Sequence, residues 1–347
     1  MSEDLLFRFG EHETRVRFSE RGPGHELADT DVLAVFDRTV HRLYGSSSAR
    51  AVVLPAGETA KTWRGAERIL AAALEAGLGR DGRLVGVGGG VVCDLTAFAA
   101  SLYMRGCRLT LYPTTLLAMV DAALGGKTAL NLGRTKNLVG TFYPAEELVI
   151  WIPALSTLPP RELRCGLAEA IKTALVGDPD LLELLRSRRT GLLGGNADAL
   201  GQAVRRCLAV KGRIVENDLR EAGGRAVLNL GHTFAHALES ATAFRRYRHG
   251  EAVAWGLGRA LALGVALGIT DRALAGELKA LLEDYGFQLG NPPGVAPRDL
   301  LAAMRADKKR RAGELRVVLL RDVGRTEVRT VGEGPVLAAL ERGVGEQ

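Results

Sequence analysis

The feature that most constrains the fold is an alternation of short apolar runs with helical patterns between residues 31 and 152. Helical patterns such as 66–76 and 94–102 separate runs that are each followed by aspartate, glycine or proline; the runs are 32–36, 51–54, 84–87, 109–112 and 148–152. Strands that are apolar on both faces and separated by helices are typical of a parallel sheet covered on both sides. This part of the chain therefore predicts an α/β domain with a nucleotide-binding type of sheet.

The pattern changes after Pro153. The next strand-like run is 315–320, and before it the apolar residues follow the 3.6-residue period of helices in 161–175, 181–189, 199–215, 232–241, 250–267 and 273–285. We therefore expect two domains, an α/β domain over 1–152 and a mainly α-helical domain over 153–347. A ligand site is expected in the cleft between them.

Composition excludes several classes of protein. Hydrophobic residues make up 47% of the 347 residues and charged residues 25%, which excludes a disordered or fibrous chain. The most apolar stretch, 260–269, is about ten residues long, whereas crossing a bilayer takes about 20. The chain starts with the acidic segment 1–4 rather than a signal segment, and its four cysteines have no C-x-x-C spacing and are expected to be reduced. We expect a cytoplasmic protein.

The net charge of +6 suits an anionic partner, which could be a nucleic acid, a nucleotide or a phosphorylated metabolite. The one tight basic cluster, 308–311, is of a kind that usually lies in a solvated loop. Charge alone therefore does not identify the partner.

Two glycine-rich segments indicate anion binding. Gly88-Gly89-Gly90 lies between an apolar run and a helix, where backbone amides can hold a pyrophosphate, although the G-x-G-x-x-G fingerprint fails at Val91. Gly125-Gly126-Lys127-Thr128 resembles the end of a phosphate-binding loop but lacks that motif's first glycine. Lys127, with Lys136 and Asn137 further on, offers donors for a phosphate or polyhydroxy ligand.

Three of the six histidines, His232, His236 and His249, are close in the sequence. His232 and His236 are four residues apart, so a helix would put both on one face, as metal-binding pairs require. The glutamate of an H-E-x-x-H motif is replaced by Thr233, which excludes that protease signature. A metal site explains the three histidines better than three separate structural roles do.

A carboxylate could complete this site. Glu169 lies in an apolar helical segment beside Lys172, three residues on, although such pairs are usually surface features. Arg225 and Asn229 add donors just before His232. A metal with open positions near cations and a nucleotide site is typical of an enzyme.

Together these motifs resemble those of the 3-dehydroquinate synthase family, within the sugar-phosphate cyclases, and the resemblance runs from about Leu54 to Leu320. It rests on an ordered series of motifs: Pro55-x-Gly57-Glu58-x3-Thr62, Gly88-Gly89-Gly90-Val91-Val92-x-Asp94, Pro113-Thr114-Thr115-Leu116-Leu117-Ala118, Val120-Asp121-x4-Gly126-Lys127-Thr128, Lys136-Asn137, Thr157-Leu158-Pro159, Gly166-Leu167-Ala168-Glu169, Leu228-Asn229-Leu230-Gly231-His232-Thr233-Phe234 and His249-Gly250-Glu251-Ala252-Val253.

The resemblance implies a divalent metal, zinc or cobalt, on Glu169, His232 and His249, with His236 near the substrate phosphate instead of on the metal. It implies NAD contacts from Asp37, Gly57, Glu58, Lys61, Gly89, Gly90, Val91, Asp94, Thr114, Thr115, Lys127 and Lys136. It implies a substrate and catalytic set of Asp121, Lys127, Asn137, Lys172, Lys211, Glu221, Arg225, Asn229 and His236, joined by Lys308 or Lys309 and by Arg105 from the second subunit of a homodimer.

The family's substrate is 3-deoxy-D-arabino-heptulosonate 7-phosphate, which becomes 3-dehydroquinate and phosphate in the shikimate pathway to aromatic amino acids. NAD takes a hydride from a secondary alcohol, phosphate leaves by β-elimination, NADH returns the hydride, and an intramolecular aldol step closes the ring. A metal stabilises the negative charge that develops on oxygen. The resemblance therefore implies an NAD- and metal-dependent carbon–oxygen lyase.

The chain departs from the family pattern at Cys93, Ala122-Ala123, Thr135 and Leu219, where glycine, Ser-Ser, glycine and glutamate are usual. Cys93 is expected to crowd the backbone near the pyrophosphate, and the poor match before Ala51 makes Asp37 the least secure NAD contact. The departures leave room for a specialised cyclase.

Alternatives therefore stay open at this point. An aminodehydroquinate synthase or a sedoheptulose 7-phosphate cyclase would keep the chemistry and change the substrate. A metal-dependent polyol dehydrogenase of similar architecture would accumulate NADH, and a nucleic-acid binder would show salt-sensitive affinity. We expect a small phosphorylated sugar acid as the substrate, a homodimer, and neither nucleic acid nor a membrane as a partner.

Overall fold

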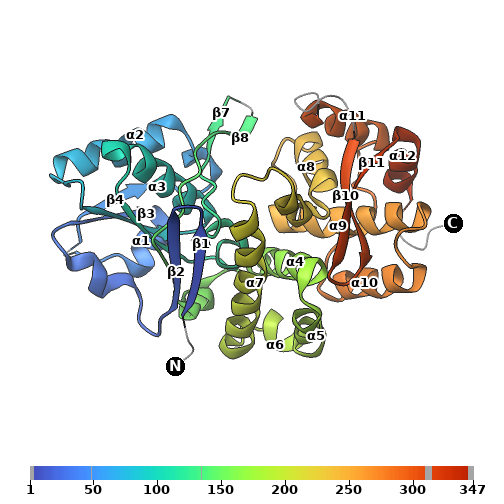
Figure 1. The fold of residues 1–347 in the computed structure, drawn as a ribbon, viewed down its shortest axis with the longest axis horizontal. Coiled ribbons are helices and arrows are strands. Elements are labelled where there is room, and N and C mark those ends of the chain that lie inside the picture. Colours follow the sequence, from blue (N-terminus) through green and yellow to red (C-terminus); the bar gives the residue numbers. More distant parts are fainter. Residues whose placement is uncertain (1–3, 48, 134, 309–314, 343–347) are drawn as a thin grey trace. The chain divides into compact units, whose positions relative to one another are not determined.

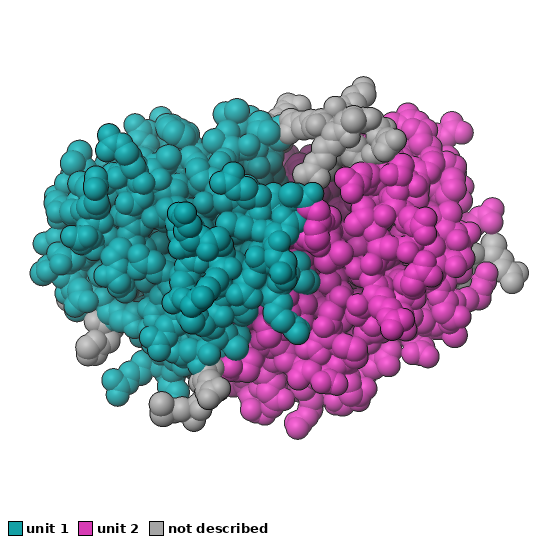
Figure 2. All heavy atoms as spheres, viewed as in Figure 1, with its two compact units in different colours: residues 1–159, 211–222 teal, residues 160–210, 223–347 magenta. Residues whose placement is uncertain are grey.

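The computed structural model describes residues 4–47, 49–133, 135–308 and 315–342, and the chain forms two compact units (Figures 1 and 2). Unit 1 comprises Met1–Pro159 and Lys211–Ala222, and unit 2 comprises Pro160–Val210 and Gly223–Gln347. The first part of unit 1 ends at Pro159, slightly beyond the expected boundary at residue 152. The segment Lys211–Ala222 also belongs to unit 1, so the two units are not separated by a single boundary in the sequence.

Unit 1 is built, in the part that the structure describes, on a seven-stranded sheet in the order β1-β2-β9-β6-β5-β3-β4. Its strands are β1 (Leu5–Phe9), β2 (His12–Phe18), β3 (Val32–Asp37), β4 (Ala51–Leu54), β5 (Arg83–Gly88), β6 (Arg108–Pro113) and β9 (Glu147–Ile150). β1 and β2 form an antiparallel hairpin, and the other neighbouring strands pair in parallel. The expected parallel sheet is confirmed, and the hairpin extends it at one edge (Figure 1).

Helices cover both faces of this sheet. α1 (Arg38–Tyr44) packs on β3 and β4. α2 (Trp63–Glu75) and α3 (Gly90–Leu102) pack on each other; α2 also packs on β3 and β4, and α3 on β5 and β6. Val32, Ala34 and Phe36 of β3 form one buried cluster with Val40 of α1, and the residues between them are buried on the other face. This explains why the strand is apolar throughout.

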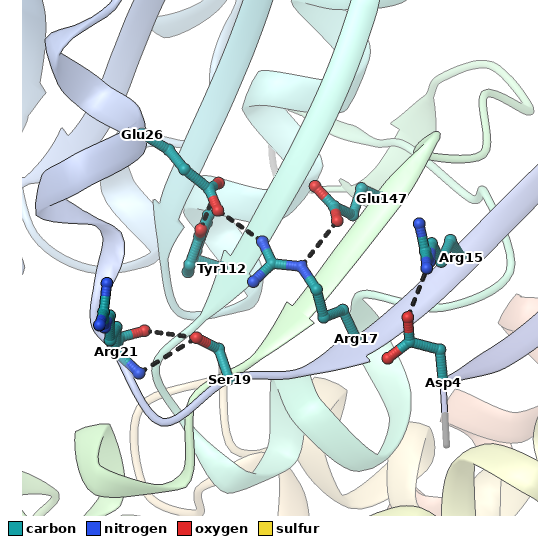
Figure 3. Close-up of polar contacts among 8 residues, drawn as sticks. All are labelled: Asp4, Arg15, Arg17, Ser19, Arg21, Glu26, Tyr112 and Glu147. Atoms are coloured by element: carbon teal, nitrogen blue, oxygen red, sulfur yellow. Dashed lines mark hydrogen bonds and ion pairs between the residues drawn. The ribbon is translucent and has the colours of Figure 1, made fainter. Parts of the chain in front are cut away.

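Charged side chains fasten the hairpin to the parallel strands (Figure 3). The guanidinium of Arg17 on β2 donates to Glu147 on β9 (2.9 Å) and to Glu26 (2.5 Å), and Tyr112 of β6 donates to the second oxygen of Glu26. The Arg17 side chain is 29% exposed. The added edge is therefore held by ion pairs as well as by backbone hydrogen bonds.

Unit 2 is mainly helical, as expected. Its helices are α4 (Pro160–Gly177), α5 (Pro179–Ser187), α6 (Arg189–Leu193), α7 (Ala197–Asn217), α8 (His232–Ala241), α9 (His249–Ala266), α10 (Arg272–Asp284), α11 (Pro297–Lys308) and α12 (Glu333–Glu341), with a hairpin of β10 (Leu315–Asp322) and β11 (Arg325–Val331). The buried helix α9 packs against α4, α8, α10, α12 and β10. No helix in the described ranges is long and apolar enough to cross a membrane.

Helix α7 belongs to both units, because it starts in unit 2 and the segment from Lys211 onward belongs to unit 1. There the amide of Arg8 donates to the carboxylate of Glu216 (2.7 Å). A Cβ on Gly212 would lie 2.1 Å from the ring of Phe7 on β1, so glycine is needed for this close packing. The end of α7 is thus a structural part of unit 1.

Candidate active site

The carboxyl ends of three parallel strands carry predicted cofactor residues in unit 1. Asp37 ends β3, Gly89 follows β5, and Thr114 follows β6, where its amide donates to the carbonyl of Gly88 (2.9 Å). The chain leaves β3 and β5 in opposite directions along the sheet. Open α/β sheets bind ligands outside the carboxyl ends of strands at such a switch point.

The turn between β5 and α3 leaves little space for side chains. A Cβ on Gly88 would lie 2.5 Å from Val92, and one on Gly89 would lie 3.1 Å from Thr115. Gly90 and Val91 form the first turn of α3, whose N-terminal amides face this edge. The turn therefore keeps backbone amides accessible to an anion.

Cys93 is accommodated beneath the same turn. Its thiol is buried and lies 3.7 Å from the carbonyl oxygen of Gly88, and burial raises its pKa. The side chain thus packs inside unit 1 rather than at the turn's outer surface. Asp37 has a structural role of its own, since its carboxylate accepts from the amides of Thr39 (2.7 Å) and Val40 (3.0 Å) at the start of α1.

A buried lysine connects two further predicted residues. Lys61 Nζ lies 2.5 Å from the carboxylate of Asp94 on α3 and donates to the side-chain oxygen of Asn137 (2.5 Å). Burial raises the pKa of Asp94, and the neighbouring Lys61 opposes this effect. Lys61 thus joins the cofactor set to the substrate set implied by the resemblance.

Asn131 is a residue that the sequence analysis missed. It lies on β7 (Leu130–Leu132), which pairs with β8 (Thr135–Val139) in a hairpin. Its side chain donates to Glu58 (2.9 Å) and accepts from the amide of Asn137 (3.0 Å), and its own amide donates to the carbonyl of Lys61 (2.9 Å). Lys136, on β8 of the same hairpin, has its Nζ 4.0 Å from the carboxylate of Glu58. Asn131 therefore orders both sets of residues, including Asn137 at its left-handed φ of 53°.

The segment after Val210 brings two charged residues to unit 1. Lys211 donates to the carboxylate (2.6 Å) and the carbonyl (2.5 Å) of Asp121, which lies in a π-helical turn. Glu221 pairs with Lys127, whose side chain is about half exposed. Four predicted residues far apart in the sequence are thus placed as two pairs.

Three helices of unit 2 bring together the predicted metal ligands. Glu169 lies within α4, and His232 and His249 are the first residues of α8 and α9. Glu169 Oε1 is 3.5 Å from His232 Nε2 and 3.2 Å from His249 Nε2, and the three potential ligand atoms lie within 4.8 Å of one another. Tetrahedral zinc with bonds of about 2.0–2.1 Å has ligand atoms roughly 3.3 Å apart. Two imidazoles and a carboxylate also form a common ligand set of catalytic zinc, so these residues fit the metal.

Charged neighbours surround the ligands. Lys172 Nζ lies 2.6 Å from Glu169 Oε2, and both side chains are buried. Burial, reinforced by Lys172, lowers the pKa of His232 to about 3. Burial also disfavours the charged form of His249, but hydrogen bonds with Glu169 and Glu239 outweigh it and raise the pKa of His249 to about 10. Glu239, buried on α8, is a second residue that the sequence analysis missed.

Two glycines allow the ligand helices to approach each other closely. A Cβ on Gly250, next to His249, would lie 2.3 Å from the Cα and the carbonyl oxygen of Cys165 on α4. A Cβ on Gly256 would lie 2.2 Å from the carbonyl oxygen of Gly231, the residue before His232. The backbone packing of α9 therefore sets the ligand geometry.

The other predicted residues lie as follows. Arg225 is buried in the short helical turn that ends at Asn229, and His236 lies one turn after His232, with ring centroids 5.6 Å apart. Arg105 is exposed, and its φ of 68° is left-handed. Lys308 ends α11, whereas Lys309 lies outside the described residues.

Comparison with known families decides the relationship. The model of the 3-dehydroquinate synthase N-terminal part matches residues 51–165, and that of the C-terminal part matches residues 166–310. The chain belongs to the 3-dehydroquinate synthase family. The family expectation from the sequence motifs is thereby confirmed.

Members of the 3-dehydroquinate synthase family are similar over most of the chain. The 3-dehydroquinate synthase of Xanthomonas axonopodis pv. citri is 45% identical over 295 residues, covering 83% of this chain and 80% of the relative. That of Dictyoglomus thermophilum is 39% identical, covering 85% and 82%. A solved structure, the 2-epi-5-epi-valiolone synthase of Streptomyces hygroscopicus subsp. jinggangensis with NAD+ and Zn2+ bound, is 29% identical with a TM-score of 0.86 over 96% of each chain.

Proposed function

We propose that this protein catalyses the 3-dehydroquinate synthase reaction, converting 3-deoxy-D-arabino-heptulosonate 7-phosphate to 3-dehydroquinate and phosphate with NAD and a divalent metal as cofactors. The observation that carries the proposal is the cluster of Glu169, His232 and His249 in a chain that is 45% identical to a 3-dehydroquinate synthase. When bound, the metal supplies Lewis-acid stabilisation of an alcohol oxygen, and NAD supplies a reversible hydride acceptor.

The residues of unit 2 are assigned to the reacting end of the substrate. Glu169, His232 and His249 hold the metal, and Lys172 keeps a fixed positive charge beside Glu169 in a buried setting, where electrostatic interactions are strong. Arg225 is a buried guanidinium, which suits recognition of carboxylate or phosphate oxygens. We assign the substrate phosphate to cations and polar side chains of this unit: Arg225, Asn229, His236 and Lys308 or Lys309.

The residues of unit 1 are assigned to NAD and to polar contacts with the substrate. The amides at the start of α3 and the residues at the carboxyl ends of β3–β6 suit a dinucleotide pyrophosphate and ribose; this set is Asp37, Gly57, Glu58, Lys61, Gly89, Gly90, Val91, Asp94, Thr114, Thr115, Lys127 and Lys136. Asp121 with Lys211, and Lys127 with Glu221, are assigned to substrate hydroxyl and carboxylate groups, together with Asn137.

Arg105 is assigned to the second subunit's site in a homodimer. It lies in an exposed turn whose apolar neighbours Leu102 and Met104 are 39% and 43% exposed, and arginine and methionine are enriched at protein interfaces. Consecutive left-handed φ angles at Met104 and Arg105 fix the turn that presents it. A cytoplasmic location, as in this family, is part of the same proposal.

The experiment follows phosphate release from 3-deoxy-D-arabino-heptulosonate 7-phosphate with NAD and Zn2+, before and after removal of the metal by a chelator. Product identity and NADH absorbance are recorded in the same reaction, and His249→Ala is the matched inactive variant. We expect chelator-sensitive phosphate release, 3-dehydroquinate as the product and no lasting NADH. Metal-loaded protein that releases no phosphate would overturn the proposal.

One alternative substrate class has a specific observation behind it. The structural similarity to a 2-epi-5-epi-valiolone synthase makes a cyclase for another sugar phosphate the second candidate. The higher identity to 3-dehydroquinate synthases, 45% against 29%, favours the first. Activity with sedoheptulose 7-phosphate but not with the heptulosonate would reverse this choice.

A further inference from the structure

We propose that Glu239 is a positioning residue of the metal centre, which holds His249 in the tautomer and orientation that present Nε2 to the metal. The inference rests on the metal site of the proposed function and adds a residue that neither the motifs nor the ligand set contains. Histidines that bind metals almost always donate their second ring N–H to a carboxylate, a backbone carbonyl or water, which fixes the ring's tautomer and orientation.

The contact is made by a buried side chain. Glu239 Oε1 lies 3.3 Å from His249 Nδ1, and Glu239 is 6% exposed. Glu239 is seven residues after His232 on α8, which places both on the same face of the helix, two turns apart. One helix therefore supplies a ligand at its first residue and the carboxylate that contacts the ligand of the next helix.

The two histidines are held in the same way by different acceptors. His232 Nδ1 lies 3.3 Å from the carbonyl oxygen of Leu230, and His249 Nδ1 lies 3.3 Å from the carboxylate of Glu239. A carbonyl and an ionised carboxylate can only accept, so each Nδ1 donates a proton to its acceptor, and Nε2 is left as the ring nitrogen that can bind a metal. Both Nε2 atoms face Glu169 Oε1. Glu239 thus does for His249 what a backbone carbonyl does for His232.

Charge gives Glu239 a second effect that a carbonyl cannot provide. Lys172 offsets the charge of Glu169, and both histidines lie at helix N-termini, which carry partial positive charge. A divalent cation in these surroundings binds more tightly when a second buried carboxylate is close to it. We therefore expect a neutral replacement of Glu239 to weaken metal binding even where it preserves the shape of the side chain.

The backbone around Glu239 fixes its position. The carbonyl of Glu239 accepts from the amide of Phe244 (2.7 Å), and Ala243 and Phe244 have left-handed φ angles of 51° and 56°. Non-glycine residues in this conformation are uncommon and persist where the surroundings over-determine them. Glu239 thus binds the turn that leads to His249 through its backbone carbonyl, and it contacts His249 itself through its side chain.

The experiment measures metal binding rather than turnover. Metal-free wild-type protein and the variants Glu239→Gln, Glu239→Asp, His249→Ala and Glu183→Gln are titrated with Zn2+ against a chromophoric chelator. Glu183 is an exposed glutamate on α5 and serves as the matched control. We expect Zn2+ affinity to fall about 10–100-fold in Glu239→Gln and to stay unchanged in Glu183→Gln.

Two further readouts separate positioning from a merely structural role. The urea midpoint of the metal-free Glu239→Gln protein should stay near that of the wild type. In the Zn2+-loaded protein, the Nδ1–H proton resonance of His249 should move upfield, because the hydrogen bond to a carboxylate is replaced by a weaker one. Glu239→Asp keeps the charge but is one methylene shorter, so its affinity should lie between those of wild type and Glu239→Gln. If Glu239→Gln fails to fold, the Nδ1–H resonance and the Zn2+ affinity of Glu239→Asp decide.

The outcomes distinguish this inference from the function on which it rests. A folded Glu239 variant that binds Zn2+ as tightly as wild type, while His249→Ala binds weakly, would overturn the role of Glu239 and leave the metal site intact. Equal Zn2+ affinity of wild type and His249→Ala would instead overturn the metal site itself.

Discussion

Replacing Gly250 with alanine should disturb the metal centre without removing any of its ligands. Gly250 follows His249 in the first turn of α9, where this helix lies close to α4, the helix that carries Glu169. An alanine Cβ would lie 2.3 Å from the Cα and the carbonyl oxygen of Cys165. Both neighbouring atoms belong to the backbone, so no flexible side chain can move aside and the helices themselves have to separate.

The required movement is large for a metal site. Non-bonded carbon atoms in contact lie about 3.5 Å apart, so the backbones have to move by roughly 1 Å, whereas metal–ligand distances vary by only about 0.2 Å. His249 Nε2 lies 3.2 Å from Glu169 Oε1 before the change. We therefore expect Zn2+ affinity to fall by at least about tenfold, as for disturbed metal surroundings in general, and overpacking to cost about 1–3 kcal/mol of stability.

Calorimetric titration of metal-free protein with Zn2+ and its unfolding in urea measure the two effects separately. Gly258→Ala is the matched control, because it lies on the same helix and its Cβ would meet only Leu289, at 3.7 Å. The control should keep the wild-type affinity and gain about 0.5–1 kcal/mol, since alanine replaces glycine inside a helix. A folded Gly250→Ala protein with the affinity of the control would refute this account of the packing.

Three further predictions concern other parts of the molecule. Burial raises the pKa of the Cys107 thiol to about 11, and all four cysteines are buried. A thiol reagent at pH 8 should therefore label the native protein slowly, whereas the unfolded protein should react with four equivalents. Rapid labelling of the native protein would contradict this. Asn131→Ala removes the hydrogen bond to Glu58, and at about 1 kcal/mol per lost bond the KM for NAD should rise about fivefold in steady-state assays. An unchanged KM would count against the assignment. Arg17→Met leaves Glu26 and Glu147 without their shared cation, and since these groups are partly exposed we expect a loss of about 1–2 kcal/mol, seen as a lower urea midpoint; an unchanged midpoint would mean that the network contributes nothing.

The sequence predicts the buried elements well because the spacing of their apolar residues follows directly from which faces are buried. The apolar runs that become β3, β5, β6 and β9 are buried on both faces, and α9 is buried along most of its length. The elements that it misses alternate with charge or are half exposed: β1 and β2 carry arginine and glutamate between apolar residues, and β11 reads Arg-Thr-Glu-Val-Arg-Thr-Val. Such edge strands depend on a neighbouring strand that local periodicity does not reveal.

For the site, spacing alone favours His232 with His236, since it reports only which residues share a helix face. The structure brings His232 together with Glu169 and His249, each on a different helix, and the family motifs imply this set where periodicity does not. Glu239 and Asn131 escape both approaches, because their contacts arise only when distant segments pack together. Nothing in the neighbouring sequence distinguishes a helical glutamate or a strand asparagine that makes such a contact from one that does not.

The shared helix α7 has a consequence for the order in which the protein is made. Phe7 packs on Gly212, Asp121 contacts Lys211, and Lys127 pairs with Glu221, so unit 1 lacks these contacts until the chain has been synthesised to residue 222. The half of the protein that leaves the ribosome first is therefore completed only after much of the second half has appeared. A gene fragment ending at Pro159 would omit a helix end that its own product needs, and a recombination event at one point could not exchange either half between relatives.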